Sequence, residues 1–151
     1  MEIIKVEQGE YRKARSPDVL DSGGIGPCIV VGAIYGKKGY MSHEVSSLID
    51  LRLDEMLRDL KKECRELRKL EIYIAGGGTD SREDTYINDG ILDERVKILE
   101  LIAEAGLSRA IKEIRWNKDR HNQTLVLLLS EHRAEYKMDS DEDLEDEDFE
   151  E

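Results

Sequence analysis

The sequence has little of several residue types that would define its class. It contains two cysteines, two prolines, one tryptophan and one phenylalanine in 151 residues. Two cysteines are too few for a disulfide framework, so we expect reduced thiols, with a single disulfide as the alternative. No apolar run approaches the roughly 20 residues of a membrane span, and no charged leader precedes an apolar segment. We therefore expect a soluble, cytoplasmic protein without membrane insertion.

The sequence also lacks a broad basic region and a metal-ligand spacing. The formal net charge is −12, but residues 139–151 hold ten acidic residues and no basic one, so the rest of the chain is nearly neutral. Such a body offers no broad cationic face for phosphates, which argues against nucleic acid as a partner. His43, His121 and His132 share no metal-ligand spacing with the cysteines. We therefore expect no structural metal.

The acidic residues also set a domain boundary. Residues 138–151 form a block of like charge with little apolar content, which predicts a disordered acidic tail. Such a tail either keeps the protein soluble or docks on a basic partner. Residues 1–137 are enough for one domain with a sizeable core.

Strand-like and helix-like segments alternate along this domain. An amphipathic helix is predicted over residues 48–68, and a second one over about 92–105 that ends at Gly106. The apolar positions expected to face inward are Leu53, Met56, Leu57, Leu60, Cys64 and Leu67 in the first helix, and Val96, Leu99, Ile102 and Ala103 in the second. Strands are predicted at residues 2–6, 10–14, 28–35, 39–43, 71–75, 110–116, 124–130 and 133–137. This order predicts an α+β fold with two main helices packed on a mixed, largely antiparallel sheet.

A short glycine turn connects the two strands that carry the most reactive side chains. The sequence Gly36-Lys37-Lys38-Gly39 predicts a hairpin turn. The second strand of this hairpin would bring His43 back towards Cys28. Strict pairing would place residue 28 opposite about residue 46. We therefore expect a bulge or bend to bring His43 up to Cys28.

Cys28 is the candidate nucleophile. It follows Gly23, Gly24 and Gly26, in a segment whose backbone N–H groups can turn towards an oxyanion. A nearby histidine would lower the thiol pKa and shuttle a proton. The alternatives are a small buried cysteine with a structural His43, or a redox-active thiol. A catalytic thiol should be partly ionised at neutral pH, whereas a structural thiol should react slowly.

The remaining candidates have simpler interpretations. Cys64 lies on the apolar face of the first predicted helix, and His121 and His132 lie in or beside predicted turns. The run Gly76-Gly77-Gly78 matches neither a dinucleotide fingerprint nor a phosphate-binding loop, and indicates a tight exit from a strand. We therefore expect no organic cofactor.

Several of these motifs together resemble the CheD family of chemoreceptor glutamine deamidases. They are Gly9-Glu10-Tyr11, the turn at Pro17, Ser22-x-Gly24-x-Gly26-x-Cys28, and Met41-x-His43 after the hairpin. The likeness covers roughly residues 5–137, and its core is similar to deamidating toxins of the cytotoxic necrotizing factor type. The resemblance implies Cys28 as nucleophile, His43 as base and Ser22 as the hydroxyl that orients them.

The chain departs from the family pattern at three places. Pro27 stands where the family commonly has serine, and Glu44-Val45-Ser46-Ser47 replaces an apolar run ending in proline. Asn117-Lys118-Asp119-Arg120 keeps only the arginine of a Gly-Gly-Asn-Arg segment. Because Pro27 has no N–H, the N–H groups near Gly26 and at Cys28 are the expected oxyanion donors.

The sequence therefore predicts a cysteine hydrolase that deamidates glutamine side chains of a protein substrate, through a Cys28–His43 dyad and a thioester. The same acyl chemistry would hydrolyse glutamyl methyl esters. The alternative is a catalytically inactive member of the fold that binds a signalling partner or a basic partner.

Overall fold

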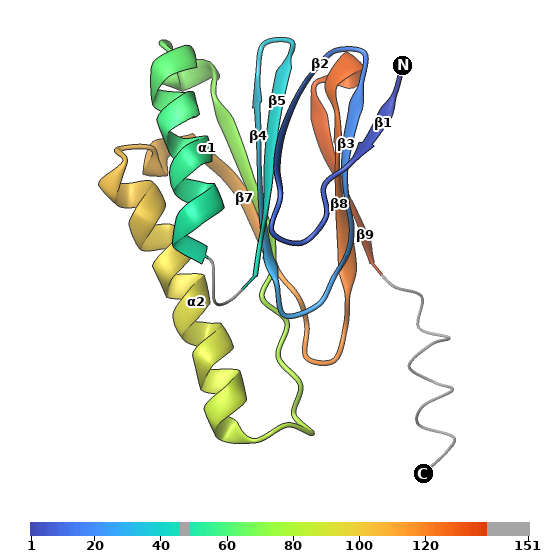
Figure 1. Ribbon diagram of the computed structural model, residues 1–151, viewed down its shortest axis with the longest axis vertical. Coiled ribbons are helices and arrows are strands. Elements are labelled where there is room, and N and C mark those ends of the chain that lie inside the picture. The colour runs from blue at the N-terminus through green and yellow to red at the C-terminus, as the bar shows by residue number, and fades with distance from the viewer. Residues whose placement is uncertain (46–48, 139–151) are drawn as a thin grey trace.

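The structure is a computed structural model that describes residues 1–45 and 49–138. It has nine strands and two α-helices among these residues (Figure 1). In chain order they are β1 (Ile3–Lys5), β2 (Tyr11–Arg15), β3 (Val19–Ile25), β4 (Ile29–Tyr35), β5 (Lys38–Glu44), α1 (Ile49–Glu63), β6 (Glu71–Gly76), α2 (Thr85–Glu104), β7 (Ile111–Trp116), β8 (Gln123–Leu128) and β9 (Arg133–Met138). The predicted α+β class is confirmed.

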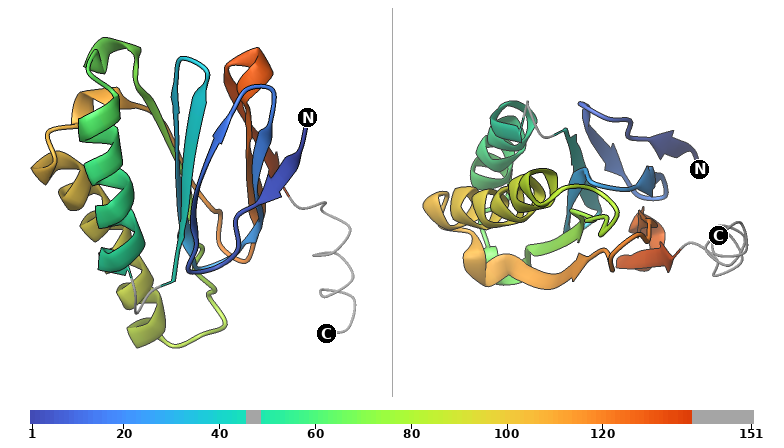
Figure 2. Two further views of the ribbon diagram at one scale, coloured as in Figure 1. Left: turned by 45° about the horizontal axis from the view of Figure 1, so that its top comes forward. Right: turned by 90° about the horizontal axis from the view of Figure 1, so that it is seen from below.

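The elements form three layers. The two helices cover one face of a five-stranded sheet, and a four-stranded sheet covers its other face (Figures 1 and 2). Two apolar cores fill the spaces between these layers. The helix-side core contains residues such as Leu53, Leu60 and Ile74. The inter-sheet core contains residues such as Leu20, Val30 and Leu127.

The five-stranded sheet has the order β2-β5-β4-β6-β7. Its pairs are antiparallel except for β6 with β7, which is parallel. The predicted hairpin is confirmed, because Tyr35 pairs with Lys38 around a two-residue turn. Gly36 in that turn has a φ of 60°, a left-handed conformation that glycine adopts without strain.

The four-stranded sheet has the order β1-β3-β8-β9 and contains a strand that the sequence did not predict. Strand β3 runs through Ser22, Gly23 and Gly24, which we had interpreted only as a glycine-rich segment leading to Cys28. Its register with β8 shifts between Asp21 and Gly24, and Gly23 has a φ of 67°. The glycines therefore form a bulge within a strand, a position where an unpaired residue with positive φ is common.

Helix α1 presents its predicted apolar face to the sheet. Leu53, Met56, Leu57 and Leu60 are buried, and Cys64 follows one turn later in the same core. The predicted extension to residue 68 is wrong, because the helix ends at Glu63 and Leu67 is 46% exposed.

Helix α2 is longer than predicted at its N-terminal end. It begins at Thr85, where the side chain of Asp84 accepts a hydrogen bond from the Ile87 N–H. Its buried residues are Ile98 and Ile102, so the predicted inward positions of Val96 and Ala103 are wrong. The predicted exit at Gly106 is confirmed.

That exit is a Schellman motif. Gly106 N–H bonds to Ala103 O, Leu107 N–H bonds to Ile102 O, and Gly106 has a φ of 78°. The glycine therefore ends the helix without strain and turns the chain towards β7.

Two further observations complete the description. No helix among the described residues is long and apolar enough to cross a membrane. The predicted acidic tail, apart from Met138 at the end of β9, lies outside the described residues.

Candidate active site

The candidate site lies at one end of the two sheets, at the lower end in Figure 1. Cys28 immediately precedes β4, His43 is the penultimate residue of β5, and Gly76 ends β6. Cys28 is 8% exposed and His43 is 2% exposed. Both residues are therefore almost enclosed.

The strand register brings Cys28 and His43 onto the same face of the sheet. His43 pairs with Val30, and the ladder between β4 and β5 has no register shift. Cys28 precedes Val30 by two residues and lies with it in the inter-sheet core. Side chains two residues apart share a face, and such diagonal pairs have Cα atoms roughly 7–8 Å apart. No bulge interrupts the pairing of Ile29–Tyr35 with Lys38–Glu44, and continuation of this pleat by one residue would make Cys28 and His43 diagonal neighbours.

A backbone carbonyl fixes the orientation of the imidazole. His43 Nδ1 lies 3.0 Å from the carbonyl oxygen of Val6, in the segment after β1. A carbonyl only accepts hydrogen bonds, so Nδ1 carries the proton in this contact and Nε2 is the unprotonated nitrogen of the neutral ring. Within the described residues, Nε2 is buried and has no hydrogen-bond partner. The imidazole therefore offers a free basic nitrogen on the inter-sheet side.

The surroundings favour neutral forms of both groups. Burial lowers the pKa of His43, while the carbonyls of Val6 and Ser22 and the charge of Glu10 act in the opposite direction. Burial raises the pKa of the Cys28 thiol, the charge of Glu94 raises it further, and its own backbone N–H lowers it. The resting thiol is therefore protonated at neutral pH, unlike the partly ionised thiol expected of a catalytic cysteine. Its proton would have to leave during nucleophilic attack.

Ser22 does not make the hydrogen bond that the resemblance implied. Its hydroxyl donates to Gly23 O at 2.7 Å and accepts from the Leu125 N–H at 2.9 Å. These bonds connect β3 to β8 at the bulge. The carbonyl of Val6 makes the orienting contact with the ring, and the backbone carbonyl of Ser22 contributes only to the pKa of His43.

The chain entering Cys28 is held through its carbonyl groups. The side-chain amide of Asn117 donates to Ile25 O at 2.8 Å and Gly26 O at 3.1 Å. The N–H groups of Gly78 and Gly77 donate to Gly26 O and Cys28 O at 2.9 and 2.7 Å. These bonds fix three carbonyl oxygens of the segment around Cys28. The Cys28 N–H faces the thiol closely enough to lower its pKa.

The two glycines proposed as oxyanion residues have different positions. Gly24 lies within β3 opposite Thr124, whereas Gly26 lies in the segment directly before Pro27 and Cys28. The structure therefore brings Gly26 and the Cys28 N–H to the site, while Gly24 belongs to the sheet.

The triple glycine allows β6 to approach this segment. A Cβ atom on Gly76 would overlap the carbonyl oxygen of Cys28, and the residue has a φ of 111°. A Cβ atom on Gly78 would lie 2.9 Å from Asn117 Nδ2 and 3.0 Å from Gly26 O. The predicted tight strand exit is confirmed, and its reason is the close approach of the Cys28 segment.

Sequence reasoning missed two amide side chains behind the site. Asn117 is 4% exposed, and its Oδ1 accepts a bond of 2.6 Å from Gln123 Nε2. Gln123 is 1% exposed and also donates to Arg115 O. The signal for Asn117 was its place in the segment compared with Gly-Gly-Asn-Arg, but its structural role required knowledge of the tertiary fold. Val6 contributes only backbone, so its residue type carried no signal.

The other candidate residues lie elsewhere. Cys64 contacts the Tyr40 hydroxyl at 3.8 Å in the helix-side core, as expected for a core residue. His121 Nδ1 lies 2.9 Å from Asp119 O, and His132 lies beside Gly36 and Glu71. In residues 1–45 and 49–138, no group of three or more His, Cys, Asp or Glu side chains is placed to hold a metal ion.

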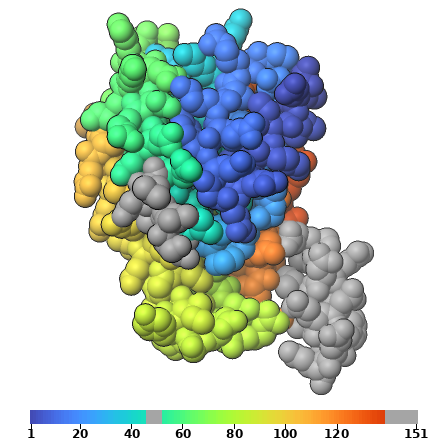
Figure 3. Space-filling view, viewed as in Figure 1, coloured from blue at the N-terminus to red at the C-terminus, as the bar shows by residue number. Residues whose placement is uncertain are grey.

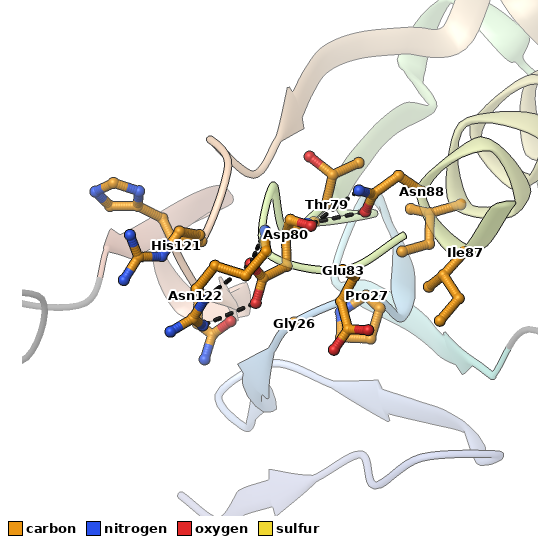
Figure 4. A pocket seen from close by; sticks show the side chains of 13 residues that line it. Gly26, Pro27, Thr79, Asp80, Glu83, Ile87, Asn88, His121 and Asn122 are labelled. Atoms are coloured by element: carbon orange, nitrogen blue, oxygen red, sulfur yellow. Dashed lines mark hydrogen bonds and ion pairs between the residues drawn. The ribbon is translucent and has the colours of Figure 1, made fainter. Parts of the chain in front are cut away.

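A pocket of about 410 Å³ opens beside the segment that enters Cys28 (Figure 4). We call it the α2 pocket. Figure 4 shows Pro27 and Ile87 on one side of it and His121 and Asn122 on the opposite side. Its lining comprises Gly26, Pro27, Gly78, Thr79, Asp80, Arg82, Glu83, Ile87, Asn88, Ile91, Arg120, His121 and Asn122. Neither Cys28 nor His43 lines it.

Comparisons with known proteins give limited similarity. The sequence matches no family model and no curated protein. The fold is similar to the crystal structure of Bacillus licheniformis hypothetical protein YfiH, with a TM-score of 0.39, 12% identity, and coverage of 71% of this chain and 49% of that one. A Neisseria meningitidis protein described under family model DUF152 gives a TM-score of 0.42 at 7% identity, over 79% of this chain and 64% of that one.

The C-terminal domain of CNFy from Yersinia pseudotuberculosis gives a TM-score of 0.42 at 14% identity, over 89% of this chain and 54% of that one. The chain therefore spans between about half and two thirds of the length of these three structures.

Proposed function

We propose that the protein is a cysteine amidohydrolase that converts glutamine side chains of a protein substrate to glutamate. The observation that carries this proposal is the state of His43. Its Nδ1–H is held by Val6 O, its Nε2 is unpartnered among the described residues, and continuation of the β4 pleat to Cys28 would put the thiol on the same face. A nucleophile, a base and a group that orients the base are the parts that acyl transfer needs.

The chemistry begins from a neutral pair. His43 Nε2 takes the proton from the Cys28 thiol as the sulfur attacks the carboxamide carbon of glutamine. The C–N bond then breaks, the imidazolium returns the proton to the leaving nitrogen, and ammonia departs from a thioester. Water, deprotonated by the same nitrogen, attacks the thioester, and the C–S bond breaks to give glutamate and the thiol.

The oxyanion needs a donor beside the sulfur. The Cys28 N–H is the candidate donor, because it acts on the thiol and lowers its pKa. Removal of one such donor from an enzyme typically costs about 10²–10³ in kcat. Pro27 leaves the Cys28 amide as the main donor.

A second candidate function is a binding module that retains the fold without catalysis. The observation that favours it is the raised pKa of Cys28, which arises from burial and from Glu94. The chemoreceptors implied by the resemblance remain candidate partners under both proposals.

The deciding experiment measures ammonia release from a set of glutamine-containing peptides and denatured proteins, with mass spectrometry to locate deamidated residues. Wild type and Cys64→Ser should deamidate glutamine, because Cys64 lies in the other core. Cys28→Ser and His43→Asn should lose activity by at least about 10²-fold. Equal activity in Cys28→Ser, or none in the wild type, would reject the enzyme proposal.

A further inference from the structure

The α2 pocket lies beside the segment that leads into Cys28. We propose that it receives an apolar side chain next to the target glutamine, which makes the protein selective for apolar-flanked glutamine. This inference rests on the proposed function, because the selectivity concerns substrates of Cys28.

One face of α2 carries two residues of the pocket lining, Glu94 and a core residue. Ile87 and Ile91 line the pocket, Glu94 lies near enough to Cys28 to raise its pKa, and Ile98 is buried in the helix-side core. Residues three or four apart lie on one face of a helix, and each step advances roughly 5 Å along the axis. Ile91 is therefore about one helical turn from Glu94, whose charge raises the pKa of Cys28.

The second connection is through the chain itself. Gly26 and Pro27 form part of the pocket wall and directly precede Cys28. An extended peptide spans about 3.3–3.6 Å per residue. A glutamine at the thiol would therefore bring a neighbouring side chain to this wall.

One wall of the lining favours an apolar side chain, whereas the rest of the lining is polar or charged. Pro27, Ile87 and Ile91 give one wall an apolar surface, and Ile87 is 45% exposed. Arg82 forms an ion pair with Asp80 at 2.8 Å, so these opposite charges on the lining neutralise each other. Burial of a large apolar side chain against this wall removes apolar surface from water on both partners.

The pocket lies beside the N-terminal part of α2, which supplies Ile87, Asn88 and Ile91 to its lining. The N-terminal part of α2 and the segment before it form the lower edge of the molecule (Figure 3). A protein partner can therefore reach this edge directly.

Hydrogen bonds hold the pocket in shape. Asp80 N–H donates to Asn88 Oδ1 at 3.0 Å, and Asn88 Nδ2 donates back to Asp80 O at 2.8 Å. Arg95 donates to Gly77 O, and Gly77 N–H donates to Cys28 O. The helix, the loop before it and the nucleophile segment are therefore joined, and the pocket needs no ordering when a substrate binds.

The test measures kcat/KM of the full-length protein for four capped peptides: Gly-Gln-Gly, Leu-Gln-Gly, Gly-Gln-Leu and Ser-Gln-Gly. In wild type, kcat/KM for one of the two leucine peptides should exceed that for Gly-Gln-Gly by about tenfold or more, as pockets for small apolar groups achieve. Ile91→Ser should reduce that ratio to near one. Leu92→Ser is the matched control, because Leu92 is exposed and does not line the pocket, and it should keep the ratio.

The outcomes separate this inference from the proposed function. If all four peptides have equal kcat/KM and this activity is lost in Cys28→Ser, the pocket inference is overturned and the enzyme proposal stands. A leucine preference that survives in Ile91→Ser and Ile87→Ser would also overturn it. No Cys28-dependent ammonia release from any peptide would reject both. Thermal unfolding of each variant establishes that it is folded.

Discussion

His43 is held by Val6: the ring Nδ1 lies 3.0 Å from the backbone carbonyl oxygen of a residue 37 positions earlier in the chain. The acceptor belongs to the main chain, so a side-chain substitution at position 6 does not delete it. The contact commits the other ring nitrogen to the unprotonated form. The acid–base properties of the site therefore depend on the docking of the N-terminal segment.

The pH dependence of activity should reflect this environment. Burial lowers the pKa of His43, and protonation of Nε2 would abolish its function as a base. The acidic limb of kcat/KM should therefore have a midpoint below the ordinary value of about 6.5. A pH profile on one peptide substrate measures this midpoint, and a midpoint above 6.5 would contradict the assigned environment.

Glu44 should make stability depend on pH. It is 1% exposed, and burial raises its pKa to about 8, while hydrogen bonds with Ser42 and the Leu53 N–H and the charge of Arg52 act in the opposite direction. The folded protein therefore retains a proton that the unfolded chain loses above about pH 4.5. The free energy of unfolding should fall as pH rises through this window, by at most about 1.4 kcal/mol per pH unit.

The variant Glu44→Gln should remove this pH dependence, because glutamine does not titrate. It should be more stable than wild type above pH 8, whereas Glu104→Gln, at an exposed position of α2, should follow the wild-type curve. Denaturant unfolding between pH 5 and 9 provides the measurement. Parallel curves for wild type and Glu44→Gln would show that this carboxyl does not titrate as described.

Gly76→Ala should be strongly destabilising. A Cβ atom there overlaps Cys28 O, and a φ of 111° is unfavourable for alanine. We expect a loss of roughly 2–5 kcal/mol together with loss of activity. Gly90→Ala is the control, because this α2 glycine has no atom within 4 Å of an added Cβ, and alanine should stabilise the helix by about 0.5–1 kcal/mol. Similar thermal midpoints for the two variants would contradict the close approach.

Asn117→Asp should disturb the nucleophile segment without changing side-chain size. Aspartate cannot donate to Ile25 O and Gly26 O, and its oxygens would face those carbonyls. The expected cost is about 1–3 kcal/mol in stability. The expected kinetic effect is a fall in kcat that exceeds the change in KM, because the Cys28 N–H is no longer held in place. An unchanged kcat in a folded variant would show that this amide does not position the oxyanion donor.

Local patterns predicted the parts of the fold that depend on local structure. The three- and four-residue apolar spacing located α1, and the two-residue turn placed Cys28 and His43 at neighbouring strand ends. Strand β3 was missed because its glycines suppress the alternation that marks a strand. The first turns of α2 were missed because they extend beyond the sheet and have few buried positions.

The sequence predicted those parts of the site that depend on reactive side chains. Cys28 and His43 stand out by residue type, whereas Val6 O and the Asn117 amide act through contacts between segments distant in sequence. Ser22 shows the opposite case. The family resemblance implied a role at the imidazole, but the hydroxyl of Ser22 accepts a hydrogen bond from the Leu125 N–H beside the bulge in β3.

The two cysteines lie in different cores, Cys28 between the sheets and Cys64 between the helices and the five-stranded sheet. Each thiol becomes shielded only when its own interface closes. The chain therefore carries one native chemical probe for each interface, without any added label. Pulsed alkylation during refolding would time the two closures separately and would establish whether the helices dock before the sheets close over the nucleophile.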